Sequence, residues 1–116
     1  MLGPTRHEDT FTRDNLPPPE AWPRIDLSGY DYPDWLNAGA ELTDRMVDRG
    51  FGDRVALVGN GRARTYKELS DWTNRLAHAL VADYGLRPGN RVLIRSANNP
   101  AMVACWLAAT KAGRWS

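Results

Sequence analysis

Residues 101–109 form an unbroken run of apolar side chains, and this run limits the fold more than any other feature of the chain. Asn99 and Pro100 precede it in the order that begins a helix, an N-cap asparagine followed by proline at the first helical position. Gly113 then ends the predicted helix, which covers about residues 101–112. A helix that is apolar almost all round is buried on more than one side. The sequence therefore predicts a helix that several neighbours enclose.

The chain reaches its last residue, Ser116, soon after this helix. In α/β proteins a helix that follows a strand normally returns to a parallel strand, yet only Arg114, Trp115 and Ser116 remain. We therefore expect an interrupted fold in which the 102–107 surface promotes self-association. The alternative is a non-enzymatic interaction module that docks onto another protein through the same surface.

Before this helix, the sequence predicts a helix and a β-hairpin. Residues 35–49 carry apolar side chains at the 3.6-residue period, with Asp34 as the N-cap. Asn60-Gly61 is the strongest short signal for a hairpin, because a type I′ turn requires positive φ at both central residues. The predicted strands on the two sides of this turn are 54–59 and 62–65.

A second helix and a strand complete the pattern. Thr65 and Glu68 match a capping box, in which the two side chains satisfy two free backbone N–H groups at a helix start. The helix runs to about Asp83, and Gly85 ends it. Residues 91–96 are predicted to form a strand, and strands that alternate with helices indicate an α/β fold. The apolar stripe of the second helix comprises Leu69, Trp72, Leu76 and Leu80.

Residues 1–33 differ from the rest of the chain. They hold six of the eight prolines, and each proline fixes its own φ and favours extended backbone at the preceding residue. We expect an extended arm, with residues 17–19 as polyproline II, that lies on a folded body made of residues 34–116. A flexible leader is the alternative, although such segments rarely carry so many aromatic side chains. Those of the arm are Phe11, Trp22, Tyr30 and Tyr32.

Length and composition exclude several classes of protein. At 116 residues and with a net charge of +1, the chain is the size of one small domain and has no charge footprint for nucleic acid or an anionic membrane. The single cysteine, Cys105, excludes a disulfide framework. The sequence has no apolar run of the roughly 20 residues that span a membrane, and residues 1–20 contain no signal-peptide core. We expect a cytoplasmic protein.

The glycines and lysines with a conceivable role in chemistry have structural explanations. Gly59-Asn60-Gly61 lies near a strand end, but it lacks the third glycine of a phosphate-binding loop and is better explained as a hairpin turn. Lys67 lies on the solvent side of its helix. Lys111 lies near a helix C-terminus, where a cation interacts favourably with the helix dipole.

The remaining candidates have similar explanations. His7 and His78 are isolated and have no carboxylates at metal-ligand spacing. Cys105 is expected to be a buried, inert thiol. Residues 96–99 lie at the C-terminal end of the predicted strand, which is where ligands of α/β folds collect. They are therefore the best surface for nucleotide contact, but helix capping explains Asn99. The sequence therefore predicts no catalytic, cofactor-binding or metal-ligating residue.

A set of short motifs runs through residues 17–113 in a characteristic order. The motifs include Asp53-Arg54-Val55-Ala56-Leu57, Arg64-Thr65-Tyr66-Lys67-Glu68-Leu69, Asn74-Arg75-Leu76-Ala77, Gly85-Leu86-Arg87-Pro88-Gly89-Asn90-Arg91-Val92, Asn98-Asn99-Pro100, Val103-Ala104-Cys105-Trp106 and Lys111-Ala112-Gly113. Taken together, they resemble the N-terminus of the adenylate-forming superfamily, the AMP-producing acyl-CoA synthetases. The likeness is strongest to benzoate and 2-aminobenzoate ligases, whose leader resembles Leu16-Pro17-Pro18-Pro19 with Trp22-Pro23 and Tyr32-Pro33 with Leu36-Asn37.

The resemblance implies that the chain is an incomplete N-terminal part of the large AMP-binding domain. Residues 1–33 would form the arm and residues 34–116 the start of the domain, and the sequence departs from the family pattern after residue 113. The intact family enzyme uses ATP, Mg²⁺ and CoA to convert a carboxylate into an acyl-AMP and then a CoA thioester. Its Ser/Thr/Gly-rich phosphate loop, ribose-binding aspartate and late lysine have no counterparts here. We therefore expect a truncated piece, inactive alone and without a cofactor, whose partner is itself or the missing remainder of the ligase.

Overall fold

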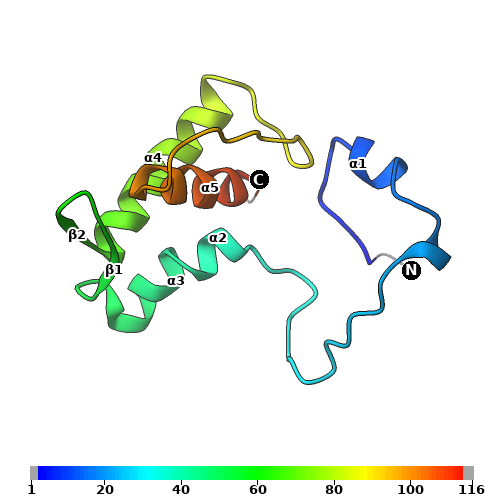
Figure 1. Cartoon of the computed structure of the whole chain (residues 1–116), viewed down its shortest axis with the longest axis horizontal. Helices are drawn as coiled ribbons and strands as arrows, with labels where there is room; N and C mark the ends of the chain where they lie inside the picture. Colours follow the sequence, from blue (N-terminus) through cyan, green and yellow to red (C-terminus); the bar gives the residue numbers. More distant parts are fainter. Residues whose placement is uncertain (1–2, 114–116) are drawn as a thin grey trace.

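Two helices, α4 (Tyr66–Ala82) and α5 (Pro100–Ala112), pack against each other at the centre of the fold in the computed structural model, which describes residues 3–113 (Figure 1). A hairpin of β1 (Val55–Gly59) and β2 (Arg62–Thr65) lies at one end of this pair. The other elements are α1 (Phe11–Asp14), η1 (Pro19–Ala21), α2 (Ala38–Glu41), α3 (Asp44–Met46) and η2 (Val47–Phe51). The chain is thus a mixed α/β structure.

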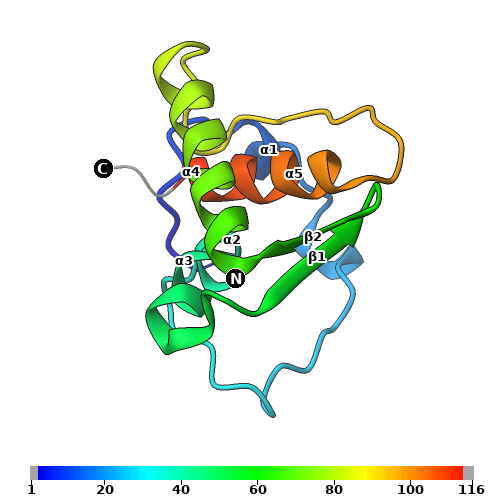
Figure 2. The ribbon, with the colours of Figure 1, turned by 90° about the vertical axis from the view of Figure 1, so that its left-hand side faces the viewer.

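Small side chains allow α4 and α5 to approach closely. Ala77 on α4 and Ala104 and Ala108 on α5 are completely buried, and Leu69 and Leu107 fill the space beside them. The short helix α2 packs against α5 from a second direction (Figure 2). The prediction that the 101–112 helix is buried on more than one side is therefore confirmed. Trp106, however, keeps 54% of its surface exposed.

The hairpin and the two helix starts confirm the sequence predictions. Asn60 and Gly61 have φ of 53° and 70°, as a type I′ turn requires. The Thr65 hydroxyl accepts a hydrogen bond from Glu68 N, and the Glu68 carboxylate accepts one from Thr65 N. At α5, Asn99 Oδ1 accepts from Met102 N at 3.0 Å, with Pro100 at the first helical position.

The single helix predicted over 35–49 is wrong. The helix α2 starts later, with Asn37 rather than Asp34 as its N-cap, because Asn37 Oδ1 accepts from Ala40 N. The chain then leaves helical geometry at Thr43, whose φ and ψ are −129° and −82°. The buried Thr43 hydroxyl donates to Gly39 O at 2.6 Å, and this local bond competes with the helix ladder. Beyond α3, η2 contains a further irregularity at Gly50, which has φ of 85°.

The strand predicted over 91–96 is also wrong. This segment is extended, but it forms no ladder with any strand among residues 3–113. Leu93 is 94% exposed and Val92 is 42% exposed. A short apolar run becomes a strand only when a neighbour supplies the ladder hydrogen bonds. No described helix is long and apolar enough to cross a membrane.

The arm predicted from the prolines is irregular over much of its length, but it contains two short helical turns, α1 and η1, that were not expected. It runs beside the helical body in Figure 1. Tyr30 and Tyr32 stack on each other, with ring centroids 5.5 Å apart, and Phe11 is 58% exposed. Residues 8 and 9 of the arm donate backbone hydrogen bonds to Pro88 O of the body, and the Phe11 ring lies under the Arg91 guanidinium. The expected departure from the family pattern at Arg114 lies outside the described residues.

Candidate functional site

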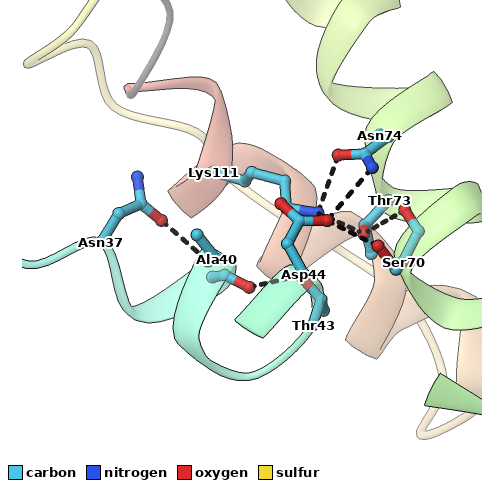
Figure 3. Close-up of polar contacts among 9 residues, drawn as sticks. Asn37, Ala40, Thr43, Asp44, Ser70, Thr73, Asn74 and Lys111 are labelled. Atoms are coloured by element: carbon cyan, nitrogen blue, oxygen red, sulfur yellow. Dashed lines mark hydrogen bonds and ion pairs between the residues drawn. The ribbon is translucent and has the colours of Figure 1, made fainter. Parts of the chain in front are cut away.

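The ammonium group of Lys111 is buried between three helices (Figure 3). Lys111 retains 1% of its surface, and its Nζ atom donates to Asp44 Oδ1 at 3.0 Å. It also donates to Thr73 Oγ1 at 3.1 Å and to Asn74 Oδ1 at 2.8 Å. A buried charge is stable only when it is paired and hydrogen-bonded. We call Asp44, Ser70, Thr73, Asn74 and Lys111 the lysine cluster.

Each side chain of the lysine cluster is placed by a local feature of the sequence. Asp44 begins α3 directly after the break at Thr43, and this break turns its carboxylate toward α4. Ser70, Thr73 and Asn74 lie three and four residues apart on α4 and therefore share one face. Lys111 reaches this face from the last turn of α5. The cluster thus joins α3, α4 and α5.

The Asp44 carboxylate is the negative centre of the lysine cluster. Burial by itself raises the pKa of this carboxyl. Hydrogen bonds from Ser70, Lys111 and Asn74, with the charge of Lys111, outweigh burial and hold the pKa below its ordinary value of 3.8. Asp44 is therefore ionised at neutral pH and compensates the buried ammonium of Lys111.

The chemical capacity of the lysine cluster follows from these contacts. The three acceptors around Nζ match the three N–H bonds of an ammonium group. Its helices also enclose it, so that a substrate cannot reach Nζ without a displacement of α3 or α4. Removal of one partner from a buried pair destabilises a protein strongly, because an uncompensated charge remains. The arrangement is suited to clamping helices together.

The sequence analysis placed Lys111 near the end of a helix but missed its burial. Lys111 was expected to interact with the helix dipole, whereas its side chain turns inward and pairs with Asp44. The predicted stripe of α4 does face the core, but Trp72, Leu76 and Leu80 are only partly buried there. The buried residues of this helix are Leu69, Ser70, Thr73 and Ala77. The polar Ser70 and Thr73 on the buried face were the signal that a charged partner lies opposite them.

The other candidate residues do not come together with the lysine cluster. Lys67 forms an exposed ion pair of 3.1 Å with Asp71. His7 and His78 are exposed. Cys105 is half-buried rather than buried. Within residues 3–113, no group of three His, Cys, Asp or Glu side chains is arranged to hold a metal ion.

Two helix N-termini are candidate cradles for a nucleotide phosphate, since free N–H groups at a helix start attract anions. At α4 the Glu68 carboxylate already occupies this position. At α5 the Asn99 side chain caps the helix and Pro100 supplies no N–H. Gly59 and Gly61 belong to the hairpin, and Ser96 and Asn98 are exposed. Neither of these two helix N-termini is therefore open to a phosphate of ATP.

Comparison with known proteins identifies the family. The family model described as "AMP-binding enzyme" matches residues 45–115, more than half of the chain. The chain belongs to the AMP-binding enzyme family. The region that matches this adenylate-forming family contains the hairpin and every residue of the lysine cluster except Asp44. Asp44 lies directly before the first matched residue.

Curated relatives of this AMP-binding chain cover several acid ligases. It is 37% identical over 78 residues to a 3-hydroxybenzoate–CoA ligase of Aromatoleum sp. (strain CIB), an alignment covering 67% of this chain and 15% of the relative. It is 34% identical over 99 residues to an acetyl-coenzyme A synthetase of Streptomyces avermitilis, covering 77% and 15%. Triostin synthetase I of Streptomyces triostinicus is 41% identical over 81 residues, covering 68% and 15%. No solved structure matches.

The chain thus spans about a seventh of the length of these relatives. Their names refer to 3-hydroxybenzoate, acetyl-coenzyme A and triostin. The likeness establishes the acid–CoA ligase family and leaves the benzoate-like specificity as a prediction.

Proposed function

We propose that this chain is part of an acid–CoA ligase, a protein that activates an aryl or acyl carboxylate with ATP and transfers it to CoA. Residues 3–113 are in this view a scaffold, and the adenylating centre is supplied by the rest of the ligase. The proposal places the protein in the cytoplasm, where ATP and CoA are available to it. The family match and the 15% coverage of the relatives support the proposal.

One observation carries the scaffold role. Adenylation brings a carboxylate against the α-phosphate of ATP, and catalysis needs N–H donors, a cation and a lysine at the reacting centre. Lys111 is bound on its Nζ atom by three acceptors of α3 and α4. Lys67 is held by Asp71 on the surface. Both lysines of the chain therefore have structural partners.

The test uses ATP–pyrophosphate exchange, which reports the adenylation step. The 116-residue chain is assayed with 3-hydroxybenzoate, benzoate and acetate, and we expect no exchange above a blank without protein. A chimaera in which residues 1–113 replace the matching segment of the Aromatoleum ligase should restore exchange. Exchange by the 116-residue chain alone would contradict the proposal, and so would a folded but inactive chimaera.

The second candidate function is a non-enzymatic interaction module that docks through α5. The observation in its favour is Trp106, which is 54% exposed on a helix that is otherwise largely covered. Ala104 and Leu107 are buried within this chain, so the available surface is narrower than the 102–107 surface expected from the sequence. Its partner would be a second copy or the remainder of the ligase, rather than nucleic acid or a membrane.

Sedimentation velocity distinguishes this candidate from the scaffold alone. If Trp106 mediates association, the chain sediments as a defined complex, and Trp106→Lys returns it to a monomer. Tyr84→Lys is a matched control, because Tyr84 is 80% exposed elsewhere in the fold. A monomer at all concentrations would exclude self-association through α5.

A further inference from the structure

Within residues 3–113, the arm forms its backbone hydrogen bonds to the body at the turn made by residues 87–91, and the Arg6 guanidinium also lies over the Trp35 ring. The backbone N–H groups of Glu8 and Asp9 both donate to Pro88 O, at 3.0 and 3.1 Å. The turn is preformed, because Arg87 N donates to Asn90 Oδ1 and Asn90 N donates to Arg87 O. The arm therefore adds its backbone to a site that the body already presents.

The Asp9 carboxylate is the centre of this attachment. It accepts hydrogen bonds from Asn90 Nδ2 at 2.8 Å and Arg91 Nη1 at 2.7 Å, both on the body. It also accepts from Phe11 N at 3.0 Å, which bends the arm around it. The Arg91 guanidinium in turn lies over the Phe11 ring, 4.6 Å from its centroid. One side chain thus organises both the arm and its contact with the body.

Gly89 shows how closely the two backbones approach. Its φ of 92° lies in the left-handed region that favours glycine. A Cβ at this position would lie 2.1 Å from Asp9 O and 3.0 Å from the Cβ atom of His7. Any side chain at position 89 would therefore push the arm away.

A cleft of about 740 Å³ lies between the arm and the body beside this contact. Thr5, Arg6 and His7 line it from the arm, and Leu86, Val92 and Thr110 line it from the body. Its volume lies in the range of small-molecule sites. The position of the arm decides how open this cleft is to solvent.

We propose that residues 6–11 are a strap that closes this cleft and that the Asp9 carboxylate holds the strap on the turn. This device goes beyond the ligase function and does not depend on it. The Arg91–Asp9 ion pair is partly exposed, because the side chain of Arg91 is 54% exposed and that of Asp9 is 28% exposed. A single pair of this kind is weak. The strap is therefore held by the combination centred on Asp9, and loss of that carboxylate releases it.

The test measures strap mobility and cleft access on the full 116-residue chain. Backbone ¹⁵N–¹H heteronuclear NOE values of residues 8, 9 and 11 report whether the strap is ordered. Asp9→Asn should lower them to the values of a free tail. Asp26→Asn is the matched control, because Asp26 also lies in the arm but bonds to Ser28 within it. The control should leave residues 8–11 ordered.

Cleft access is measured by thiol labelling of Ala109→Cys in a Cys105→Ser background, since Ala109 lines the cleft. Adding Asp9→Asn should raise the labelling rate several-fold, and Gly89→Ala should do the same by a steric route. Far-UV circular dichroism should show α4 and α5 intact in every variant. Unchanged NOE values and labelling in Asp9→Asn would overturn the proposal. Loss of helix on Asp9→Asn would overturn it as well, because Asp9 would then support the fold rather than a strap.

Discussion

The Nζ atom of Lys111, in the last turn of α5, donates a 3.0 Å hydrogen bond to Oδ1 of Asp44, the first residue of α3. The two residues are 67 positions apart in the chain. Their contact is nearly closed to solvent on the lysine side and is completed by Thr73 and Asn74 of α4. It ties three helices of the chain to one another through a single ammonium group.

Replacement of this ammonium should be costly. Lys111→Met removes the buried ammonium that pairs with Asp44, whose side chain is 29% exposed, and we expect the free energy of unfolding to fall by about 1–3 kcal/mol. Lys67→Met is the control, because the Lys67–Asp71 pair is exposed and should contribute about 0–1 kcal/mol. Urea denaturation followed by circular dichroism measures both. Equal effects of the two substitutions would show that burial of Lys111 contributes nothing.

The lysine cluster should also make stability depend on pH. Since the pKa of Asp44 is held below 3.8 in the fold, its stabilisation is present above that value and is lost as pH falls through the folded pKa. The Asp44→Asn variant should be less stable than the wild type at pH 7, and its stability should change less with pH between pH 5 and 2. Thermal unfolding across this range measures the difference. A wild-type profile parallel to that of Asp44→Asn would contradict the assignment.

Gly39 should tolerate no side chain. A Cβ there would lie 2.6 Å from Leu107 O and 3.0 Å from Lys111 N, so Gly39→Ala must push α2 away from α5. Overpacking of this kind costs about 1–3 kcal/mol. Gly29→Ala is the matched control, because no atom lies within 4 Å of the added Cβ. The melting temperatures of the Gly39→Ala and Gly29→Ala variants measure this cost. Similar melting temperatures would mean that α2 and α5 have room for an added Cβ at position 39.

The features predicted correctly from the sequence are those that a few neighbouring residues determine. The Asn60-Gly61 turn, the capping box of Thr65 and Glu68, and the Asn99 cap each depend on local backbone bonds. The family resemblance was also readable, because its motifs follow one another along the chain, and the family match confirms it.

The features missed or predicted wrongly depend on distant partners. Residues 91–96 include the apolar run 92–94, but a strand also requires a neighbour to pair with, and none pairs with this segment among residues 3–113. The break at Thr43 follows from a buried hydroxyl bond that periodicity does not report. The burial of Lys111 depends on Asp44, Thr73 and Asn74, which come from two other helices. Sequence spacing alone does not bring such residues together.

The central claim is that Lys111 clamps helices in a ligase scaffold and takes no part in adenylation. The most direct test is the chimaera with the Aromatoleum ligase, with and without Lys111→Met, assayed by ATP–pyrophosphate exchange well below both melting temperatures. We predict a lower melting temperature for Lys111→Met and an unchanged exchange rate per folded molecule. A Lys111→Met chimaera that is fully folded but has lost exchange would contradict the claim and place Lys111 in the chemistry.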